Sequence, residues 1–147
     1  MQELSVESEI EIRFNEVDTY NTVWHGNYAV YFETGRQKFA NTYSLGYREL
    51  LTAGFYVPII KLEIDYKATL KYNDRIRLIT TYIDTDATKI IFRYEARRLH
   101  DNKLVCTGRS EQVFVRMDWS IQITLPEYLQ AWKRRWLTKS LTAEVRS

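Results

Sequence analysis

The sequence contains little of what is typical of secreted, membrane-spanning or nucleic-acid-binding proteins. It has one cysteine, Cys106, which excludes an internal disulfide and is typical of a reducing compartment. No run of residues is apolar enough to span a membrane, and the first residues lack the basic and apolar pattern of a signal peptide. The 21 basic and 19 acidic residues leave a net charge of +2, which gives no reason to expect a nucleic-acid partner. We therefore expect a cytoplasmic protein without a membrane or nucleic-acid partner.

The composition is that of one globular domain. The chain has 147 residues, of which 45% are hydrophobic and 27% are charged, and this length supports one hydrophobic core but not two. The sequence contains no repeat, low-complexity tract or linker, so residues 1–147 are expected to form a single domain. It also lacks metal-ligand spacing and a glycine-rich phosphate loop, so we expect neither a metal nor a cofactor.

Apolar residues and one glycine at helical spacing predict a long helix in the first third of the chain. They are four, three, four and four residues apart and share one face. These residues are Tyr28, Phe32, Gly35, Phe39 and Tyr43. A glycine inside a helix costs about 1 kcal/mol relative to alanine, and close approach to another backbone would explain Gly35. The pair Leu45-Gly46 predicts the end of this helix, and a shorter helical segment is expected up to Gly54.

Alternation of apolar and polar residues predicts strands on both sides of this helical region. The expected strands cover residues 9–14, 60–71, 76–82, 90–97 and about 103–117. Short turns join the last four, which implies that successive strands are antiparallel. Pro126 suits the first turn of a closing helix that carries Trp132 and Trp136.

This order of elements predicts an α+β domain in which a curved antiparallel sheet of about five strands wraps around the long central helix. The helix is aromatic on its buried face, so we expect it to fill the concave side of the sheet. A single sheet of this kind leaves its edges free, which favours self-association.

The most informative stretch is the loop before the long helix. Asp18 is followed, after six residues, by the run His25-Gly26-Asn27-Tyr28. The loop brings a carboxylate and an imidazole to a helix N-terminus, where exposed N–H groups can stabilise a developing negative charge. A carboxylate, a proton carrier and an oxyanion site are the parts that hydrolysis of a thioester or an ester requires.

Further motifs extend this pattern over about residues 9–137. The residues are Val23, Trp24, the Phe-Glu-x-x-Arg set Phe32, Glu33 and Arg36, and the runs Tyr66-Lys67-Ala68 and Tyr72-Asn73-Asp74. With the Asp18 loop, they make the chain resemble the 4-hydroxybenzoyl-CoA thioesterase family of the hotdog fold, including the bacterial acyl-CoA thioesterases encoded near the Tol-Pal system. The resemblance implies a hotdog fold and hydrolysis of an acyl-CoA to the free acid and CoA.

The resemblance also implies roles for the matching residues. Asp18 is the catalytic carboxylate, acting either as the nucleophile or as a general base on water. The backbone N–H of His25 polarises the thioester carbonyl, and the His25 side chain orients water or assists proton transfer. The substrate-binding residues that the resemblance implies are Trp24, Gly26, Asn27, Tyr28, Lys67 and Lys71. The family further implies a homodimer or homotetramer with sites at the subunit interface.

Two departures from the family pattern keep other functions open. Tyr20 and Thr22 follow Asp18 where relatives commonly have small residues, and their bulk favours a non-catalytic acyl-binding protein as one alternative. The turn with Asp84 and Asp86 is acidic where one branch of the family grips coenzyme A phosphates, so a thioesterase for acyl carrier protein is another alternative. The sequence does not identify the acyl group.

Several of these residues also have a purely structural interpretation. Asp18 can serve as a turn or capping residue, and Asn27 is favoured as a helix N-cap. Glu33 and Arg36 are three residues apart on the helix, so we expect them to form an ion pair. Cys106 lies in a strand without an obvious activating partner and is expected to be an inert, packed thiol.

Overall fold

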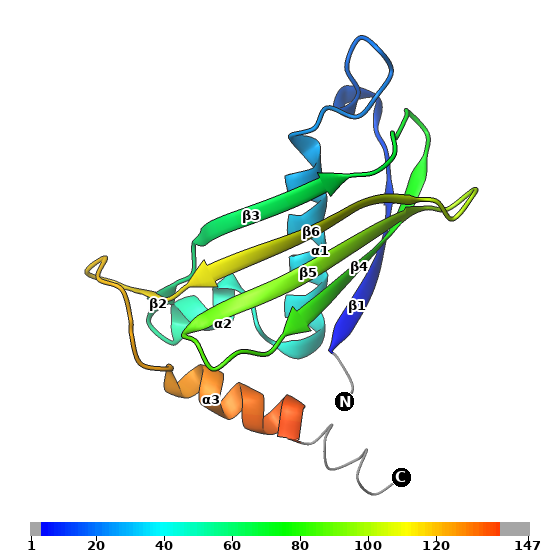
Figure 1. Cartoon of the computed structure of the whole chain (residues 1–147). Coiled ribbons are helices and arrows are strands. Elements are labelled where there is room, and N and C mark those ends of the chain that lie inside the picture. The colour runs from blue at the N-terminus through cyan, green and yellow to red at the C-terminus, as the bar shows by residue number, and fades with distance from the viewer. Residues whose placement is uncertain (1–3, 139–147) are drawn as a thin grey trace, which may run out of the picture.

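The structure of the protein is a computed structural model that describes residues 4–138, and it shows a curved sheet wrapped around one long helix (Figure 1). Within this range the main sheet has five strands in the order β1-β4-β5-β6-β3. Their bounds are β1 Ser5–Glu11, β3 Ile59–Tyr66, β4 Arg75–Ile83, β5 Lys89–Arg98 and β6 Leu104–Val113. All neighbouring strands in it are antiparallel. The predicted α+β architecture with about five strands is therefore confirmed.

The long helix α1 (Asn27–Tyr43) crosses one face of this sheet and supplies much of the hydrophobic core. Its buried residues are Tyr28, Tyr31, Phe32, Gly35, Arg36, Phe39 and Ala40. Phe32 stacks flat on Tyr94 of β5, with ring centroids 4.1 Å apart, and Phe39 meets Phe92 of the same strand edge-on at 5.0 Å. The predicted aromatic face is therefore the face that packs on the sheet.

Gly35 is the point at which α1 lies closest to β4. A Cβ atom at this position would overlap with Thr80 Oγ1 and would lie 2.9 Å from Leu78 Cδ2. The sequence predicted close approach to another backbone, but the atoms nearest to Gly35 belong to side chains. The cost of a glycine inside the helix is therefore offset by direct packing of the helix on the sheet.

Shorter elements surround this core. They are the 3₁₀ turn Phe14–Glu16, α2 (Tyr47–Thr52), β2 (Phe55–Tyr56), β7 (Val115–Arg116), α3 (Glu127–Lys133) and the π-helical turn Arg134–Thr138. Strands β2 and β7 pair with each other, and the indole N–H of Trp132 ties α3 to the carbonyl of Tyr43 at 2.7 Å. Both predicted short helices are confirmed, although Pro126 is the N-cap of α3 and not part of its first turn. None of the helices among residues 4–138 is long and apolar enough to cross a membrane.

Three of the predicted strands have different bounds in the structure. The first strand lies at Ser5–Glu11 instead of 9–14. It begins earlier because Ser5 to Ser8 already pair with β4, and it ends earlier because the N–H of Arg13 bonds to Glu16 Oε1 at 2.7 Å and closes a turn there. Strand β3 ends at Tyr66 instead of residue 71, since two successive N–H groups, those of Lys67 and Ala68, share the Val105 carbonyl and end the regular ladder. The last long strand is divided at Phe114 into β6 and β7.

Candidate active site

The loop that precedes α1 is closed by backbone hydrogen bonds at its base. Val17 and Val23 form an antiparallel bridge, and the carbonyl of Glu16 accepts the N–H of Trp24 at 3.0 Å. The same carbonyl accepts Asn27 Nδ2 at 2.9 Å. These contacts fix the loop against the first turn of α1. The side chain of Asn27 is therefore a loop anchor, and the prediction that Asn27 caps the helix is wrong because Gly26 occupies the N-cap.

Asp18 lies at the start of a tight turn inside this loop and is exposed. Its Oδ1 accepts the N–H of Tyr20 at 2.8 Å and that of Thr22 at 3.3 Å. Asn21 takes the left-handed backbone conformation, with φ of 57°, that the turn requires. The structural interpretation of Asp18 as a turn residue is therefore confirmed. Its second oxygen, Oδ2, receives no hydrogen bond from the described residues, so the same carboxylate keeps one oxygen available for chemistry.

The start of α1 provides unpaired backbone donors close to Asp18 in the chain. Within residues 4–138, the N–H groups of His25 and Gly26 find no acceptor. They precede a helix of 17 residues, whose dipole adds partial positive charge at this end. The His25 carbonyl is held by the hydroxyl of Tyr66, which lies at the end of β3, at 3.0 Å. Unpaired N–H groups at a helix N-terminus are the kind of donor that can stabilise negative charge on an oxygen atom.

Trp24 explains the small residue at position 26. A Cβ atom on Gly26 would overlap with the indole of Trp24, which is 54% exposed and folds back over the helix start. The ring of Trp24 also lies 5.0 Å from that of His25. Trp24 therefore places an exposed apolar ring beside Gly26 and His25 at the start of α1. Tyr20, by contrast, is 86% exposed, so its bulk does not fill the site in the single chain.

Tyr28 is buried, with 3% of its surface exposed, and supports the loop from below. Its ring meets that of Tyr66 edge-on, with centroids 4.9 Å apart. Burial raises the pKa of the Tyr28 phenol to about 12, with smaller contributions from Cys106 and Tyr66. Tyr28 is therefore neutral and packed in the core, and its contact with substrate stays a prediction.

The segment 67–74 backs the Asp18 loop and carries the two predicted lysines. Val23 donates its N–H to the carbonyl of Leu70 at 2.8 Å. The side chains of Lys67 and Lys71 are both exposed, while their backbone N–H groups bond to Val105 O and to Asp74 Oδ2. Both ammonium groups are free to meet phosphates in this geometry, and that role stays a prediction.

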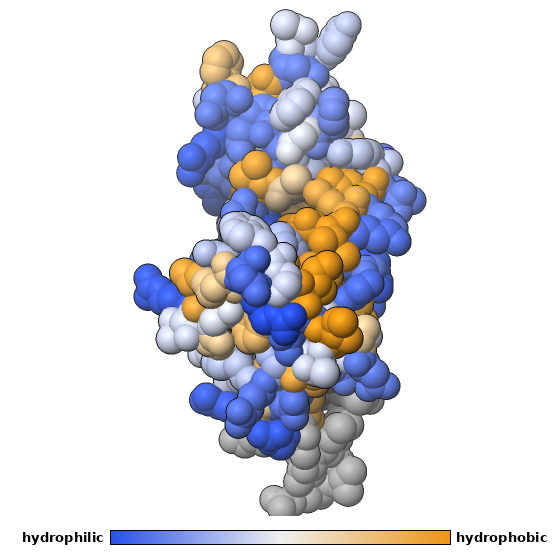
Figure 2. All heavy atoms as spheres, turned by 90° about the vertical axis from the view of Figure 1, so that its left-hand side faces the viewer, coloured by the Kyte–Doolittle hydropathy of each residue, from blue (hydrophilic) through white to orange (hydrophobic). Residues whose placement is uncertain are grey.

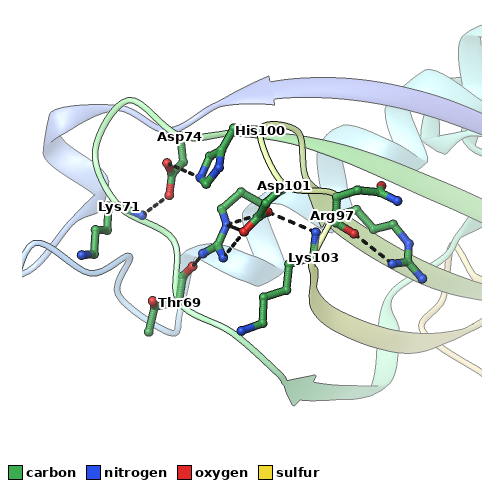
Figure 3. Close-up of polar contacts among 9 residues, drawn as sticks. Thr69, Lys71, Asp74, Arg97, His100, Asp101 and Lys103 are labelled. Carbon is green, nitrogen blue, oxygen red and sulfur yellow. Dashed lines mark hydrogen bonds and ion pairs between the residues drawn. The ribbon is translucent and has the colours of Figure 1, made fainter.

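Arg98, which the sequence did not single out, holds segment 67–74 in place. Figure 3 shows the labelled residues of this region, among them Thr69, Asp74, His100 and Asp101. The Nη1 of Arg98 donates to the carbonyl of Thr69 at 2.6 Å, and its Nη2 lies 2.7 Å from Asp101 Oδ2. The hydrogen bonds from Arg98 hold the pKa of Asp101 well below its usual range. His100 is exposed, and its Nε2 lies 3.6 Å from Asp74 Oδ1. The turn between β5 and β6 thus holds segment 67–74, and this segment in turn backs the loop that carries Asp18.

No ion pair between Glu33 and Arg36 forms among the described residues, so this prediction is wrong. Arg36 instead donates Nη1 to the hydroxyl of Tyr94 at 2.9 Å, while Glu33 stays exposed. The Tyr94 hydroxyl lies 2.6 Å from Ser110 Oγ. Glu33 and Arg36 lie near the middle of α1, away from its N-terminus, and border a small cleft between α1 and α2.

Cys106 is fully buried in β6. Burial raises the pKa of its thiol to about 12, so the nucleophilic thiolate is scarce at neutral pH. The expectation of a packed thiol is confirmed, and nothing in the geometry gives Cys106 a chemical role.

The comparison with known families agrees with this fold. Residues 12–133 match the profile of the thioesterase-like superfamily, and the chain belongs to this family. It is also 30% identical, over 86 residues, to the inferred acyl-CoA thioesterase YneP of Bacillus subtilis (strain 168). This match spans 58% of the chain and 62% of that relative.

Solved structures confirm the predicted hotdog fold. A DHNA-CoA thioesterase from Staphylococcus aureus superposes with a TM-score of 0.74 at 22% identity, covering 97% of this chain and 89% of that one. A second Staphylococcus aureus protein, SAV2348, solved in complex with CoA, superposes with a TM-score of 0.78 at 14% identity, covering 92% and 85%. The narrower resemblance to the 4-hydroxybenzoyl-CoA branch and to the Tol-Pal thioesterases stays a prediction.

Proposed function

We propose that the protein hydrolyses an acyl-CoA thioester to the free acid and CoA. One observation carries the proposal: the free Oδ2 oxygen of Asp18 and the unpaired N–H groups of His25 and Gly26 belong to one short loop at the start of a long helix. Membership of the thioesterase-like superfamily, the name of the Bacillus relative and the CoA complex of a structural neighbour support it.

In the proposed reaction, the thioester carbonyl oxygen lies at the N–H groups of His25 and Gly26. Asp18 either takes a proton from a water molecule that attacks the carbonyl carbon, or attacks this carbon itself. In both cases negative charge develops on the carbonyl oxygen, where the two N–H groups and the helix dipole stabilise it. The C–S bond then breaks, and CoA leaves as a thiolate that needs little acid assistance. If Asp18 is the nucleophile, water cleaves the resulting anhydride in a second step.

We also propose that two copies pair along β3, which lies at the edge of the sheet and has β6 as its one neighbour among the described strands. Two of its apolar side chains face solvent, since Ile60 is 55% and Leu62 39% exposed. Figure 2 shows a band of apolar surface on the side of the molecule where β3 begins. An unpaired edge with an uncovered apolar face favours addition of another strand.

The alternation of side chains along β3 and the charges on this strand together favour one register for this pairing. Antiparallel strands place like faces opposite each other, so Leu62 meets Leu62 of the partner subunit about a two-fold axis. Lys61 then lies opposite Glu63 of the partner subunit. By symmetry, Glu63 lies opposite Lys61 of the partner subunit, so two pairs of opposite charges form. Tyr66 comes next to the start of β3 in the partner. Sedimentation analysis tests the pairing, and a chain that stays monomeric at all concentrations contradicts it.

The test of the activity is thiol release from a panel of acyl-CoA and aroyl-CoA esters by wild type and Asp18→Asn. The amide oxygen of asparagine still accepts the turn N–H groups, so the variant keeps the loop while losing the base or nucleophile. We expect a loss of kcat of about 100-fold or more. Glu7→Gln, a change at an exposed carboxylate of β1, is the matched control and should hydrolyse at the wild-type rate.

Full activity in a folded Asp18→Asn variant would overturn the proposed role of Asp18. Two alternatives remain measurable in the same assay. Faster turnover of the same acyl group on acyl carrier protein than on CoA would identify a carrier-protein thioesterase. Tight binding of CoA esters without any turnover would identify an acyl-binding protein of the same fold.

A further inference from the structure

An open apolar groove lies where α2, β2 and the turn after β7 meet, next to the start of β3. It offers about 310 Å³ of space that water can enter, which is within the range of small-molecule sites. Its wall includes Tyr47, Leu51, Tyr56, Pro58 and Trp119, and none of the described residues that line it carries a charge. The groove belongs to the side of the molecule where Figure 2 shows the apolar band.

Two side chains of α2 form one wall of this groove. Tyr47 and Leu51 are four residues apart, so they share one face of the helix. Both are about half exposed in the single chain, and their apolar surface is therefore open to a ligand. Removal of such surface from water is the main source of affinity for an apolar group.

Trp119 lies on the other side of the groove, and its backbone is strained there. Its φ of 69° is in the left-handed region, which a bulky residue rarely adopts. The turn holds this conformation, since the N–H of Trp119 bonds to the carbonyl of Arg116 at 2.8 Å and Asp118 Oδ1 accepts the N–H of Ser120 at 3.0 Å. The indole stacks on the ring of Tyr56, with centroids 4.8 Å apart, yet Trp119 is 72% exposed. The strained turn thus presents a fixed apolar surface without burying it.

The proposed pairing along β3 brings this groove to the active loop of the partner subunit. With Leu62 opposite Leu62 of the partner subunit, Pro58 in the groove wall lies opposite Tyr66 of the partner subunit, because the strands run in opposite directions. Tyr66 is the residue whose hydroxyl holds the carbonyl of His25. Neighbouring strands are about 4.8 Å apart, so the groove of one subunit opens beside the His25 loop of the other.

From this geometry we propose that the groove of one subunit binds the acyl chain of a substrate whose thioester lies at the Asp18 loop of the partner subunit. The inference rests on the proposed function and on the pairing along β3. The preferred substrates are then CoA esters of unsubstituted acyl chains of medium length. Several methylene groups are needed to cross from the carbonyl over the strand edge into the groove. A carboxylate at the far end would lose water there without gaining a partner.

The first experiment measures kcat/KM for straight-chain CoA esters from acetyl-CoA to decanoyl-CoA. Between butyryl-CoA and octanoyl-CoA we expect a rise of about two- to four-fold for each methylene group, as for burial of apolar surface. Suberyl-CoA, in which a carboxylate replaces the terminal methyl group of octanoyl-CoA, should be hydrolysed about ten-fold less efficiently or worse. Equal values for butyryl-CoA, octanoyl-CoA and suberyl-CoA would overturn the inference.

Two variants on opposite sides of the groove test its role directly. Trp119→Asn removes the indole but keeps a residue that tolerates positive φ, and Leu51→Gln keeps a good helix former in α2. In both, the ratio of kcat/KM for octanoyl-CoA to that for butyryl-CoA should fall by about four-fold or more. Ile123→Asn, at an exposed residue outside the groove wall, should keep the wild-type ratio. An altered sedimentation of the first two variants with an unchanged ratio would make the groove a subunit contact and overturn the inference.

Mixed dimers show which subunit supplies the groove. Co-expressed Asp18→Asn and Trp119→Asn chains form dimers in which one site combines Asp18 of one chain with the intact groove of the other. Octanoyl-CoA hydrolysis per chain should therefore exceed the mean of the two variants measured separately. A value equal to that mean would overturn the assignment of the groove to the partner's site.

A binding measurement keeps this inference separate from the proposed function. S-octyl-CoA and S-ethyl-CoA are thioethers that are not hydrolysed, and calorimetry compares their affinities on wild type and Trp119→Asn. Tighter binding of S-octyl-CoA that depends on Trp119, without hydrolysis of any thioester, would support the groove and overturn the proposed activity. Hydrolysis without dependence on chain length, together with equal affinities for the two thioethers, would overturn the groove alone.

Discussion

Two regions along α1, one at its N-terminus and one near its middle, are built by different means. At the N-terminus, Asp18 is exposed and its carboxylate is held by N–H groups two and four residues further along the chain. Near the middle, Arg36 is buried and bonds to Tyr94, which is 58 residues away in sequence. The first site is a local turn at the surface, while the second exists only once the helix lies on the sheet. Changes at the first should therefore alter activity, and changes at the second should alter stability as well.

The largest difference in stability is expected from removing one tyrosine hydroxyl in each of these two regions. Tyr94→Phe takes away the acceptor of Arg36 Nη1 in a fully buried place and should lower the free energy of unfolding by about 1–3 kcal/mol. Tyr66→Phe removes a bond to His25 O from a half-exposed residue and should cost about 0.5 kcal/mol or less. Urea unfolding of both variants measures the difference, and equal losses would contradict it.

A smaller contrast is expected from adding one methyl group to each of two glycines. Gly35→Ala forces α1 away from Thr80 and Leu78 and should cost about 1–2 kcal/mol, after the helix propensity of alanine offsets part of the overpacking. Gly26→Ala meets the exposed ring of Trp24, which can rotate away, so thermal unfolding should change little while thioester hydrolysis falls. If Gly26→Ala unfolds at a lower temperature than Gly35→Ala, the comparison is wrong.

The smallest effect concerns how the free energy of unfolding depends on pH. It involves Arg98 and Asp101, which hold the segment behind the loop that carries Asp18. Arg98 lowers the pKa of Asp101 in the folded chain, so this pair stabilises the fold above the unfolded pKa of about 4. That contribution is lost as the pH falls toward the folded value. Asp101→Asn should therefore unfold with a shallower dependence on pH below pH 4 than wild type, and Asp86→Asn should not. Parallel curves for wild type and Asp101→Asn would contradict this assignment.

The sequence predicted the local features well, since local spacing determines them. The aromatic face of α1, the turns between strands and the loop from Asp18 to Tyr28 all follow from residues near each other in the chain. Arg36 was assigned to Glu33, its neighbour on the helix, because spacing cannot show that Tyr94 offers a better buried partner. Arg98 was missed for the same reason, as its partner Thr69 is 29 residues away.

The ends of the first two predicted strands were also misplaced, again for reasons outside local periodicity. Alternation continues past Glu11, but the bond from Arg13 to Glu16 closes a turn there. Alternation also continues to residue 71, but Lys67 and Ala68 share one carbonyl of β6, and the ladder stops. Apolar residues on β3 alternate as predicted, yet Ile60 and Leu62 stay exposed in the single chain. A sequence pattern indicates a buried face without showing which surface buries it.

The bare backbone at Gly35 connects the packing of α1 to the position of its first turn. Because α1 rests directly on Thr80 and Leu78 at this glycine, a side chain there would displace the helix from the sheet. The backbone N–H groups at the start of α1 belong to the same rigid element, so they would shift with it. A substitution in the middle of the helix should therefore lower thioester hydrolysis as well as stability.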